Sequence, residues 1–395
     1  MRSKRRTPGS FCLAFSALLA STAIVQAADF HPLYSFAGPD GAFPMSTPIF
    51  DGDGNLYATT FLGGSCPAFE DGCGTVFVIA ADGTESVLHA FKGQAADGDG
   101  PLGNFVRDGD GNFFGVTQRG GGHGCDQDRG CGTVFRLTSG GREKLLYAFA
   151  GGNDGSSPNG LVTDSLGTLY GTTMFGGSHG FGTVFRVSPR GKFKLLYSFA
   201  GGSDGGNPAG SLVLDNKGNL YGTTQFGGSD DCSTGCGTVF QVRSDGGEKV
   251  VYAFRGGDEG YQPMAGLLPD GNGGYYGTTF YGGGDGCGTV FHLDSGGKEA
   301  VLHNFTEQDG CSPQATLIGD KQGNLYGTTQ LGGADSFGTV FQLAPDGQES
   351  VLYAFTGAGD GCLPEAALVK HKGQLYGTAL TCGSTFNGTV FSVRP

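Results

Sequence analysis

The stretch Leu220-Tyr221-Gly222-Thr223-Thr224, followed by Gly227-Gly228 and Gly237-Thr238-Val239-Phe240, recurs in close copies along the 395-residue chain. Its aromatic residue returns seven times, at spacings of 50 to 57 residues: Tyr57, Phe114, Tyr170, Tyr221, Tyr276, Tyr326 and Tyr376. Self-similarity on this scale is typical of a solenoid, a propeller or an array. The repeat therefore decides the fold, but it does not decide the ligand.

Each copy contains four short runs that favour β-strands, which in the fourth copy are 210–214, 220–224, 237–242 and 248–254. The first two are joined by Asp215-Asn216-Lys217-Gly218, and a turn that starts with Asp and ends with Gly is typical of a tight hairpin. Helices are disfavoured because no segment has ten or more residues of apolar 3.6-residue periodicity. We therefore expect an all-β chain of four-stranded antiparallel units.

The two ends of the chain predict how these units close. The seventh copy stops after three runs, at 388–393, whereas the run 33–36 precedes the first copy and resembles the fourth run of another copy, 196–199. If the N-terminal run completes the last unit, the result is a seven-bladed β-propeller of four-stranded antiparallel blades. A β-solenoid or a tandem sandwich is the alternative, but an open solenoid needs polar caps and has no use for a split unit.

The motif Leu-Tyr-Gly-Thr-Thr, Gly-Gly and Gly-Thr-Val-Phe resembles the Gloeo/Verruco (GloVer) tandem-repeat family of exported bacterial proteins, from Gly54 to Phe391. The Gly-Gly pair alone is similar, more loosely, to kelch propellers. The family resemblance implies export and, in many members, attachment to the cell surface, and it supplies no catalytic residue. We expect no C-terminal anchor, because the sequence stops at Pro395.

Residues 1–27 have the layout of a cleaved secretory signal, with four basic residues before the apolar run 11–25. We expect the mature chain, 28–395, to be a single propeller domain in the periplasm or outside the cell. No later run approaches the ~20 apolar residues of a membrane span. Loss of Arg2, Lys4, Arg5 and Arg6 takes the formal net charge from −13 to −17, and this acidity argues against nucleic acid and anionic membranes as partners.

Ten cysteines remain after cleavage, an even number that favours disulfides in an exported chain. Three pairs lie within single loops: Cys66 with Cys73, Cys125 with Cys131, and Cys232 with Cys236. Two further predicted pairs join a loop to a link on the same face: Cys287 with Cys311, and Cys362 with Cys382. Zinc binding is the competing interpretation of the local pairs, but no His or second Cys pair stands at ligand spacing. Free thiols are the alternative for the last four cysteines.

The loops between the second and third strands, such as 63–74 and 120–132, and the links between blades are expected on one face, the loop-rich face. A ligand site is predicted there, at the mouth of the central channel. Each link carries one acidic residue followed by Gly, two variable residues and Pro. These acids are candidate binding residues: Asp40, Asp97, Asp154, Asp204, Glu259, Asp309 and Asp360. As a ring of carboxylates they could hold Ca²⁺. The competing interpretation is structural, with Asp accepting backbone N–H bonds, Gly taking an unusual φ and Pro fixing the entry to the strand.

Other motifs are interpreted as structure or chance. Asp51-Gly52-Asp53-Gly54-Asn55 and its copy 108–112 resemble the start of a calcium loop, but the later bidentate acid is missing, so a hairpin turn is favoured. Gly-x-Ser-x-Gly at 176–180 and 201–205 lacks the strand-turn-helix context of a nucleophile elbow. His89 and His303 stand where other copies have Tyr, and we expect them to be packed residues rather than bases.

The copies are too alike for one blade to stand out as an active centre. We therefore expect a non-catalytic, monomeric, exported propeller that binds a carbohydrate or a protein, or serves as an envelope scaffold. The alternative is a propeller enzyme, a hydrolase or lyase acting on polysaccharide with link acids as catalysts. No catalytic residue is assigned, and calcium at the link acids is the one cofactor considered.

Overall fold

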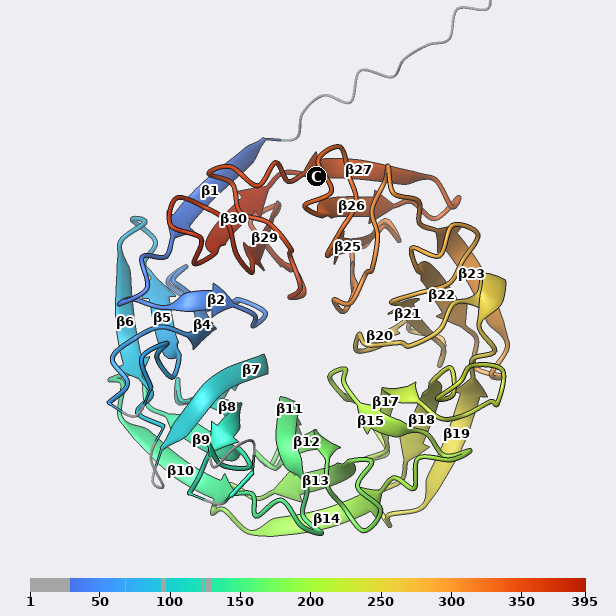
Figure 1. The fold of residues 1–395 in the computed structure, drawn as a ribbon, viewed down its shortest axis with the longest axis horizontal. Coiled ribbons are helices and arrows are strands. Elements are labelled where there is room, and N and C mark those ends of the chain that lie inside the picture. Colours follow the sequence, from blue (N-terminus) through green and yellow to red (C-terminus); the bar gives the residue numbers. More distant parts are fainter. Residues whose placement is uncertain (1–28, 68, 94–96, 123, 126–128) are drawn as a thin grey trace, which may run out of the picture.

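The computed structural model describes residues 29–395 except 68, 94–96, 123 and 126–128, so the predicted signal segment 1–27 lies outside the described residues. Seven antiparallel sheets are arranged as blades around a central axis (Figure 1). The prediction of an all-β, seven-bladed β-propeller is confirmed. In the described part of the chain the one helical element is η1 (Gly257–Glu259), a single 3-10 turn in a link.

The first four blades follow the chain in order. Blade 1 contains β2 (Ala42–Pro44), β3 (Ile49–Phe50), β4 (Leu56–Leu62), β5 (Thr75–Ile79) and β6 (Glu85–Ala90). Blade 2 contains β7 (Gly98–Arg107), β8 (Phe113–Gly120), β9 (Thr133–Leu137) and β10 (Glu143–Ala148). Blade 3 contains β11 (Ser156–Thr163), β12 (Leu169–Phe175), β13 (Thr183–Val187) and β14 (Phe193–Ser198). Blade 4 contains β15 (Gly206–Pro208), β16 (Val213–Leu214), β17 (Leu220–Phe226), β18 (Thr238–Val242) and β19 (Glu248–Ala253).

The last three blades complete the ring. Blade 5 contains β20 (Leu268–Pro269), β21 (Tyr275–Thr279), β22 (Thr289–Leu293) and β23 (Glu299–Asn304). Blade 6 contains β24 (Ile318–Gly319), β25 (Leu325–Thr329), β26 (Thr339–Leu343) and β27 (Glu349–Ala354). Blade 7 contains β28 (Val369–His371), β29 (Gln374–Ala379), β30 (Thr389–Val393) and, from the other end of the chain, β1 (Phe30–Ser35).

Blade 7 closes the ring with both chain ends, as the sequence predicts. Strand β1 pairs antiparallel with β30, so that Phe30 lies opposite Val393 and Ser35 opposite Thr389. In Figure 1 the blue N-terminal strand lies beside the red C-terminal one. Strand β1 thus covers the outer edge of β30, which would otherwise be the edge of a three-stranded blade.

The innermost strands differ from the prediction. The run 210–214 was expected as one strand, but only Val213 and Leu214 of it form β16, and the link supplies a second short piece, β15. Near the axis the blades approach each other closely, since a Cβ added at Gly210 would lie 2.2 Å from the carbonyl oxygen of Ala265 in the next blade. In blade 4 the inner edge contacts the neighbouring blade in place of a continuous ladder, whereas the inner strands of blades 2 and 3, β7 and β11, are continuous.

An edge-to-face pair of phenylalanines forms the core of every blade junction. One ring follows the outer strand of a blade, and the other belongs to the Gly-Thr-Val-Phe of the next blade. All seven pairs are at most 1% exposed, with centroids 4.9–5.2 Å apart: Phe36–Phe77, Phe91–Phe135, Phe149–Phe185, Phe199–Phe240, Phe254–Phe291, Phe305–Phe341 and Phe355–Phe391. Burying each ring stabilises the fold by about 1.5–3 kcal/mol, and edge-to-face packing adds about 0.5–1.5 kcal/mol per pair.

Contacts at the start of the third strand explain the Gly-Thr of the repeat. A Cβ added at Gly237 would lie 2.6 Å from Cδ of Pro263, the proline of the next link. The same contact recurs at all seven junctions, and Gly388 makes it with Pro44 across the ring closure. Next to it, the buried hydroxyls of Thr238 and Thr224 lie 2.8 Å apart. Glycine is therefore required where the third strand meets the neighbouring blade.

All ten cysteines after the predicted signal are paired as the sequence predicts. The five disulfides are Cys66–Cys73, Cys125–Cys131, Cys232–Cys236, Cys287–Cys311 and Cys362–Cys382. Disulfides in this number are typical of an exported protein. Within the described residues, no helix has the length and apolar character needed to cross a membrane.

Candidate functional site on the loop-rich face

The seven link acids lie against the outer strands. In five junctions a tyrosine of the outer strand donates its hydroxyl to the acid of the following link: Tyr34 to Asp40, Tyr147 to Asp154, Tyr197 to Asp204, Tyr252 to Glu259 and Tyr353 to Asp360. In the other two, His89 and His303 take the place of the tyrosine, beside Asp97 and Asp309. The pKa of Tyr147 is raised by burial and then by its bond to Asp154.

The same carboxylates hold the turns of the links. Six of the seven accept a backbone N–H from the preceding turn, as Asp154 does from Ala150 at 2.9 Å. The following glycine has a left-handed φ, 98° at Gly155 and 91° at Gly205. These contacts support the structural interpretation of the link acids. Cation binding by them stays a prediction, and the structure places them at the rim, beside the outer strands.

The candidate calcium loop in blade 1 is a hairpin turn. Oδ1 of Asp51 accepts the backbone N–H groups of Asp53 and Asn55, at 3.0 and 2.9 Å. Its Oδ2 accepts hydrogen bonds from the Asn55 amide and the Tyr57 hydroxyl, at 2.8 and 3.1 Å. The carboxylate is therefore engaged by its own hairpin, which agrees with the turn favoured from sequence.

The central channel narrows to a cavity of about 260 Å³ lined by inner-strand residues and by side chains near the ends of the second strands. Its polar lining is rich in amides, which include Asn104, Asn159 and Gln225. Glu365 is the one charged side chain among the described lining residues, and none of the link acids belongs to them. Burial raises the pKa of Glu365, while hydrogen bonds from Gln330 and Gln314 oppose this rise.

Exposed apolar side chains gather on the loop-rich face. They stand at the ends of the second strands and in the loops that follow: Phe175, Phe181, Tyr281, Leu331, Phe337 and Phe386. Phe181 is 40% exposed and yet held in place, because its ring packs on Gly201, where an added Cβ would lie 2.5 Å from it. These side chains are spread over blades 3, 5, 6 and 7, and scattered exposed apolar residues are normal in soluble proteins.

A groove of about 920 Å³ lies on this face between blades 3 and 4. Phe181 and Phe226 contribute aromatic rings to it. Its polar groups are supplied by the link between these blades and by the second-to-third loop of blade 4, with Ser203, Asn207, Asp230, Ser233 and Thr234 among them. Aromatic surface combined with a few polar groups is the composition of small-molecule and sugar sites.

Disulfides and phenylalanines anchor the loops of this face in equivalent ways. In blade 2 the link residue Gly151 lies so close to Cys125 that a Cβ would be 2.2 Å from its sulfur. In blades 3 and 6 phenylalanines, Phe181 and Phe337, take this place. An alignment of the copies could have found these two phenylalanines. The residue before Gly-Thr-Val-Phe is cysteine in four of the seven blades, and it is phenylalanine in blades 3 and 6. These rings are not among the site residues predicted from the sequence.

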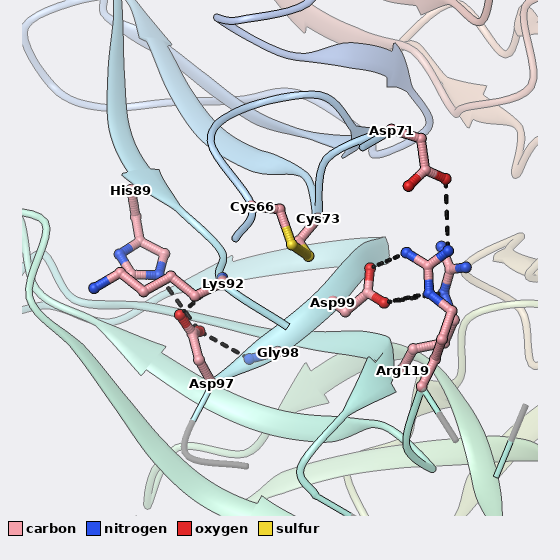
Figure 2. The surroundings of a disulfide bond; sticks show 10 residues. Cys66, Asp71, Cys73, His89, Lys92, Asp97, Gly98, Asp99 and Arg119 are labelled. Carbon is pink, nitrogen blue, oxygen red and sulfur yellow. Dashed lines mark hydrogen bonds and ion pairs between the residues drawn. A yellow bond between two sulfur atoms is a disulfide. The ribbon is translucent and has the colours of Figure 1, made fainter. Parts of the chain in front are cut away.

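The loops of blades 1 and 2 are further joined by a buried ion pair (Figure 2). Asp99 is fully buried and accepts Nε–H of Arg129 at 2.9 Å, and Arg119 lies 3.6 Å away. Arg129 also lies 3.5 Å from Asp71 and stacks over the ring of Phe69. Burial raises the pKa of Asp99, and the arginines oppose that rise. The loops of this side of the face are thus fixed to one another.

Solved structures similar to this chain are propellers of varied origin. An extracellular domain attributed to a one-component system of B. thetaiotaomicron has a TM-score of 0.60 and 10% identity, covering 91% of this chain and 39% of that one. An extracellular domain attributed to a hybrid two-component system of the same organism has a TM-score of 0.57 and 14% identity, covering 93% and 41%. This chain thus spans about two fifths of their lengths.

A gluconolactonase from Xanthomonas campestris has a TM-score of 0.45 and 17% identity, covering 76% of this chain and 86% of that one. At 10% and 14% identity, the likeness to the two extracellular domains shows the fold alone. A search of curated proteins finds no significant match.

The sequence match is more specific than the structural ones. Residues 125–320 and 229–395 match the repeat that defines one family, so the match covers well over half of the chain and includes blades 3 to 6 entirely. The matched ranges contain the Gly-Thr-Val-Phe residues of blades 2 to 7, which take part in the blade junctions described above. The chain belongs to the Gloeobacter/Verrucomicrobia repeat family.

Proposed function

We propose that this protein is an exported, non-catalytic binding module that holds a neutral carbohydrate chain in the groove between blades 3 and 4. The observation that carries the proposal is the pair of rings, Phe181 and Phe226, beside hydroxyl and amide side chains in that groove. A pyranose ring has an apolar C–H face and a polar edge. The first packs on an aromatic ring and the second needs hydrogen-bond partners.

Charge and rigidity both support this ligand class. The formal net charge of −13 disfavours acidic polysaccharides, which a strongly acidic surface repels. The Cys232–Cys236 disulfide holds the blade 4 side of the groove, and the packing of Phe181 on Gly201 holds the blade 3 side. A preformed groove loses little side-chain entropy on binding. The five disulfides support a location in the periplasm or outside the cell.

The test is a glycan array followed by calorimetry on the best neutral glycan. We expect Phe181→Ala to weaken binding at least about tenfold, which corresponds to ~1.4 kcal/mol. The matched control is Phe337→Ala, because Phe337 packs on Gly357 in the same way but does not line the groove. Equal losses in the two variants would contradict the proposed site.

The same glycans are then incubated with the protein and examined for cleavage. We expect saturable binding without turnover. Turnover that is abolished by substitution of one or two link acids would overturn the non-catalytic assignment and favour the hydrolase or lyase considered from sequence.

A further inference from the structure

One blade junction brings together three metal-ligating side chains from three different segments. His303 stands on the outer strand β23 of blade 5, Asp309 on the link, and Glu349 at the start of the outer strand β27 of blade 6. One potential ligand atom of each lies within 4.8 Å of the others. Nε2 of His303 is 3.1 Å from Oδ2 of Asp309. The cluster lies at the rim, apart from the groove between blades 3 and 4.

The seven junctions share one plan and differ in two of its positions. The outer strand supplies Tyr or His, the link supplies an acid, and the next outer strand begins with Phe or Glu. Phe follows Tyr at two junctions, Glu follows Tyr at three, and Glu follows His at two. Both histidine junctions therefore combine an imidazole with two carboxylates, in His303, Asp309 and Glu349 and in His89, Asp97 and Glu143.

The groups at junction 5–6 are arranged for a ligand that all three share. Oδ1 of Asp309 accepts hydrogen bonds from the backbone N and the hydroxyl of Thr306, at 2.7 and 3.0 Å, which leaves Oδ2 facing His303. Oε1 of Glu349 is buried and has no hydrogen-bond partner. A buried carboxylate oxygen without a partner lowers the stability of the fold unless a hydrogen bond or a cation satisfies it.

We propose that this junction binds a divalent first-row transition metal ion, such as Zn²⁺, through His303, Asp309 and Glu349. Zinc takes His nitrogen and carboxylate oxygen at about 2.0–2.2 Å in tetrahedral geometry, which places ligand atoms roughly 3.4 Å apart. The 3.1 Å between His303 and Asp309 is already near this separation. The bound ion offsets the charge of two neighbouring carboxylates and ties blade 5 to blade 6. Calcium prefers six to eight oxygen ligands, and this donor set does not supply them.

Junction 1–2 is a weaker copy of the same arrangement. Nε2 of His89 lies 3.6 Å from Oδ1 of Asp97 (Figure 2). Both oxygens of Asp97 also accept backbone N–H groups, from Gly98 at 2.8 Å and from Lys92 at 3.1 Å. The two oxygens are therefore less free to face a metal ion. Junction 1–2 therefore serves as an internal control and is not the proposed site.

The experiment uses the untagged, disulfide-bonded protein after treatment with a chelator and removal of the chelator. Zn²⁺ at 100 µM is expected to raise Tm by roughly 3 °C or more, whereas Ca²⁺ and Mg²⁺ at the same concentration leave Tm unchanged. Co²⁺ as a spectroscopic probe is expected to give visible absorption bands at a stoichiometry of one ion per chain.

His303→Tyr is the decisive variant, since tyrosine stands at this position in five junctions and can donate to Asp309 as the others do to their acids. We expect it to keep the metal-free Tm within about 2 °C and to lose both the Zn²⁺ shift and the Co²⁺ bands. Glu349→Gln should lose them as well, and His89→Tyr should keep them. A Zn²⁺ shift that persists in His303→Tyr, or the absence of any shift and any Co²⁺ band in the parent protein, overturns the proposal.

Discussion

Blade junctions that end in a stacked ring differ from those that end in a partly buried carboxylate at one position, the first residue of the outer strand. At junction 2–3, Phe193 stacks on Tyr147 with ring centroids 4.3 Å apart, and at junction 6–7, Phe30 stacks on Tyr353 at 3.8 Å. At junctions 3–4 and 4–5 the position holds Glu248 and Glu299. Both kinds of junction have a tyrosine and a link acid, which is Glu259 at junction 4–5 and Asp at the other three.

The exchange of Phe for Glu makes the stability of the junction depend on pH. Oε1 of Glu248 and of Glu299 is buried without a hydrogen-bond partner. Burial first, and then the neighbouring acids Asp204 and Glu259, raise the pKa of both residues to about 7. At the stacked junctions this position holds a ring that does not titrate, so its contribution to stability does not depend on pH. The carboxylate junctions make part of the stability depend on protonation.

The largest effect is expected from removing a stacked junction and the ring closure together. Deletion of residues 28–37 removes β1 and Phe30, so that β30 becomes an open edge and Tyr353 loses its stacking partner. We expect aggregation or loss of cooperative unfolding, measured by size-exclusion chromatography and thermal melting. An unchanged melting temperature would contradict the importance of closure.

A large effect is also expected inside an intact ring. Phe193→Ala should lower the free energy of unfolding by about 2–4 kcal/mol, because a partly buried ring and its stacking on Tyr147 are lost. Denaturant unfolding measures it. The matched control is Glu248→Ala at the same position of the next blade, expected within about 1 kcal/mol of the parent. If both variants lose equal stability, the two kinds of junction do not differ as described.

The reverse exchange should stabilise a carboxylate junction. Glu248→Phe places a ring beside Tyr197, as Phe193 stands beside Tyr147, and should raise the free energy of unfolding at pH 8 by about 0.5–1.5 kcal/mol. Lys249→Phe, at the exposed neighbouring position, is the control and should not stabilise. A gain in the control alone would show that strand propensity, rather than stacking, is responsible.

The smallest effect concerns pH. A carboxyl group whose pKa is higher in the folded than in the unfolded state contributes stability that is fully present below the unfolded value of about 4.3 and is lost as pH rises through about 7. Substituting both Glu248 and Glu299 by Gln should therefore flatten the fall in stability between pH 5 and pH 8. Parallel pH profiles of variant and parent would contradict these shifts. Asp82, on an exposed turn, gives a control through Asp82→Asn.

Much of the fold follows from the sequence because a repeat of this length is compatible with few architectures. In a chain of seven copies whose last unit is split, the N-terminal strand can complete the last blade. The pairing of β1 with β30 does so. The disulfide Cys287–Cys311 also follows, since the strand count places both segments on one face. The broken inner strand of blade 4 does not follow, since blades 2 and 3 carry the same repeat and yet form continuous inner strands.

The candidate sites were harder to predict than the fold. The link acids were visible as a recurrent position, but their tyrosine partners, such as Tyr147 for Asp154, are identified only once the turn geometry is known. The triad of His303, Asp309 and Glu349 spans two blades, so no local spacing signals it. The clue in the sequence is the substitution of His for Tyr in a column where the next blade begins with Glu.

The closure within blade 7 also brings the two ends of the described chain together. The backbone N–H of Arg394 donates to the carbonyl of Asp29 at 3.2 Å, and their side chains lie 3.4 Å apart. A short linker could therefore join the ends without disturbing a strand. The chain could then be reopened at an exposed hairpin of another blade, such as the turn from Ser188 to Lys192. The ring thus has the geometry of a circularly permutable protein. The chain ends could be moved to another blade while the packing between blades stays the same.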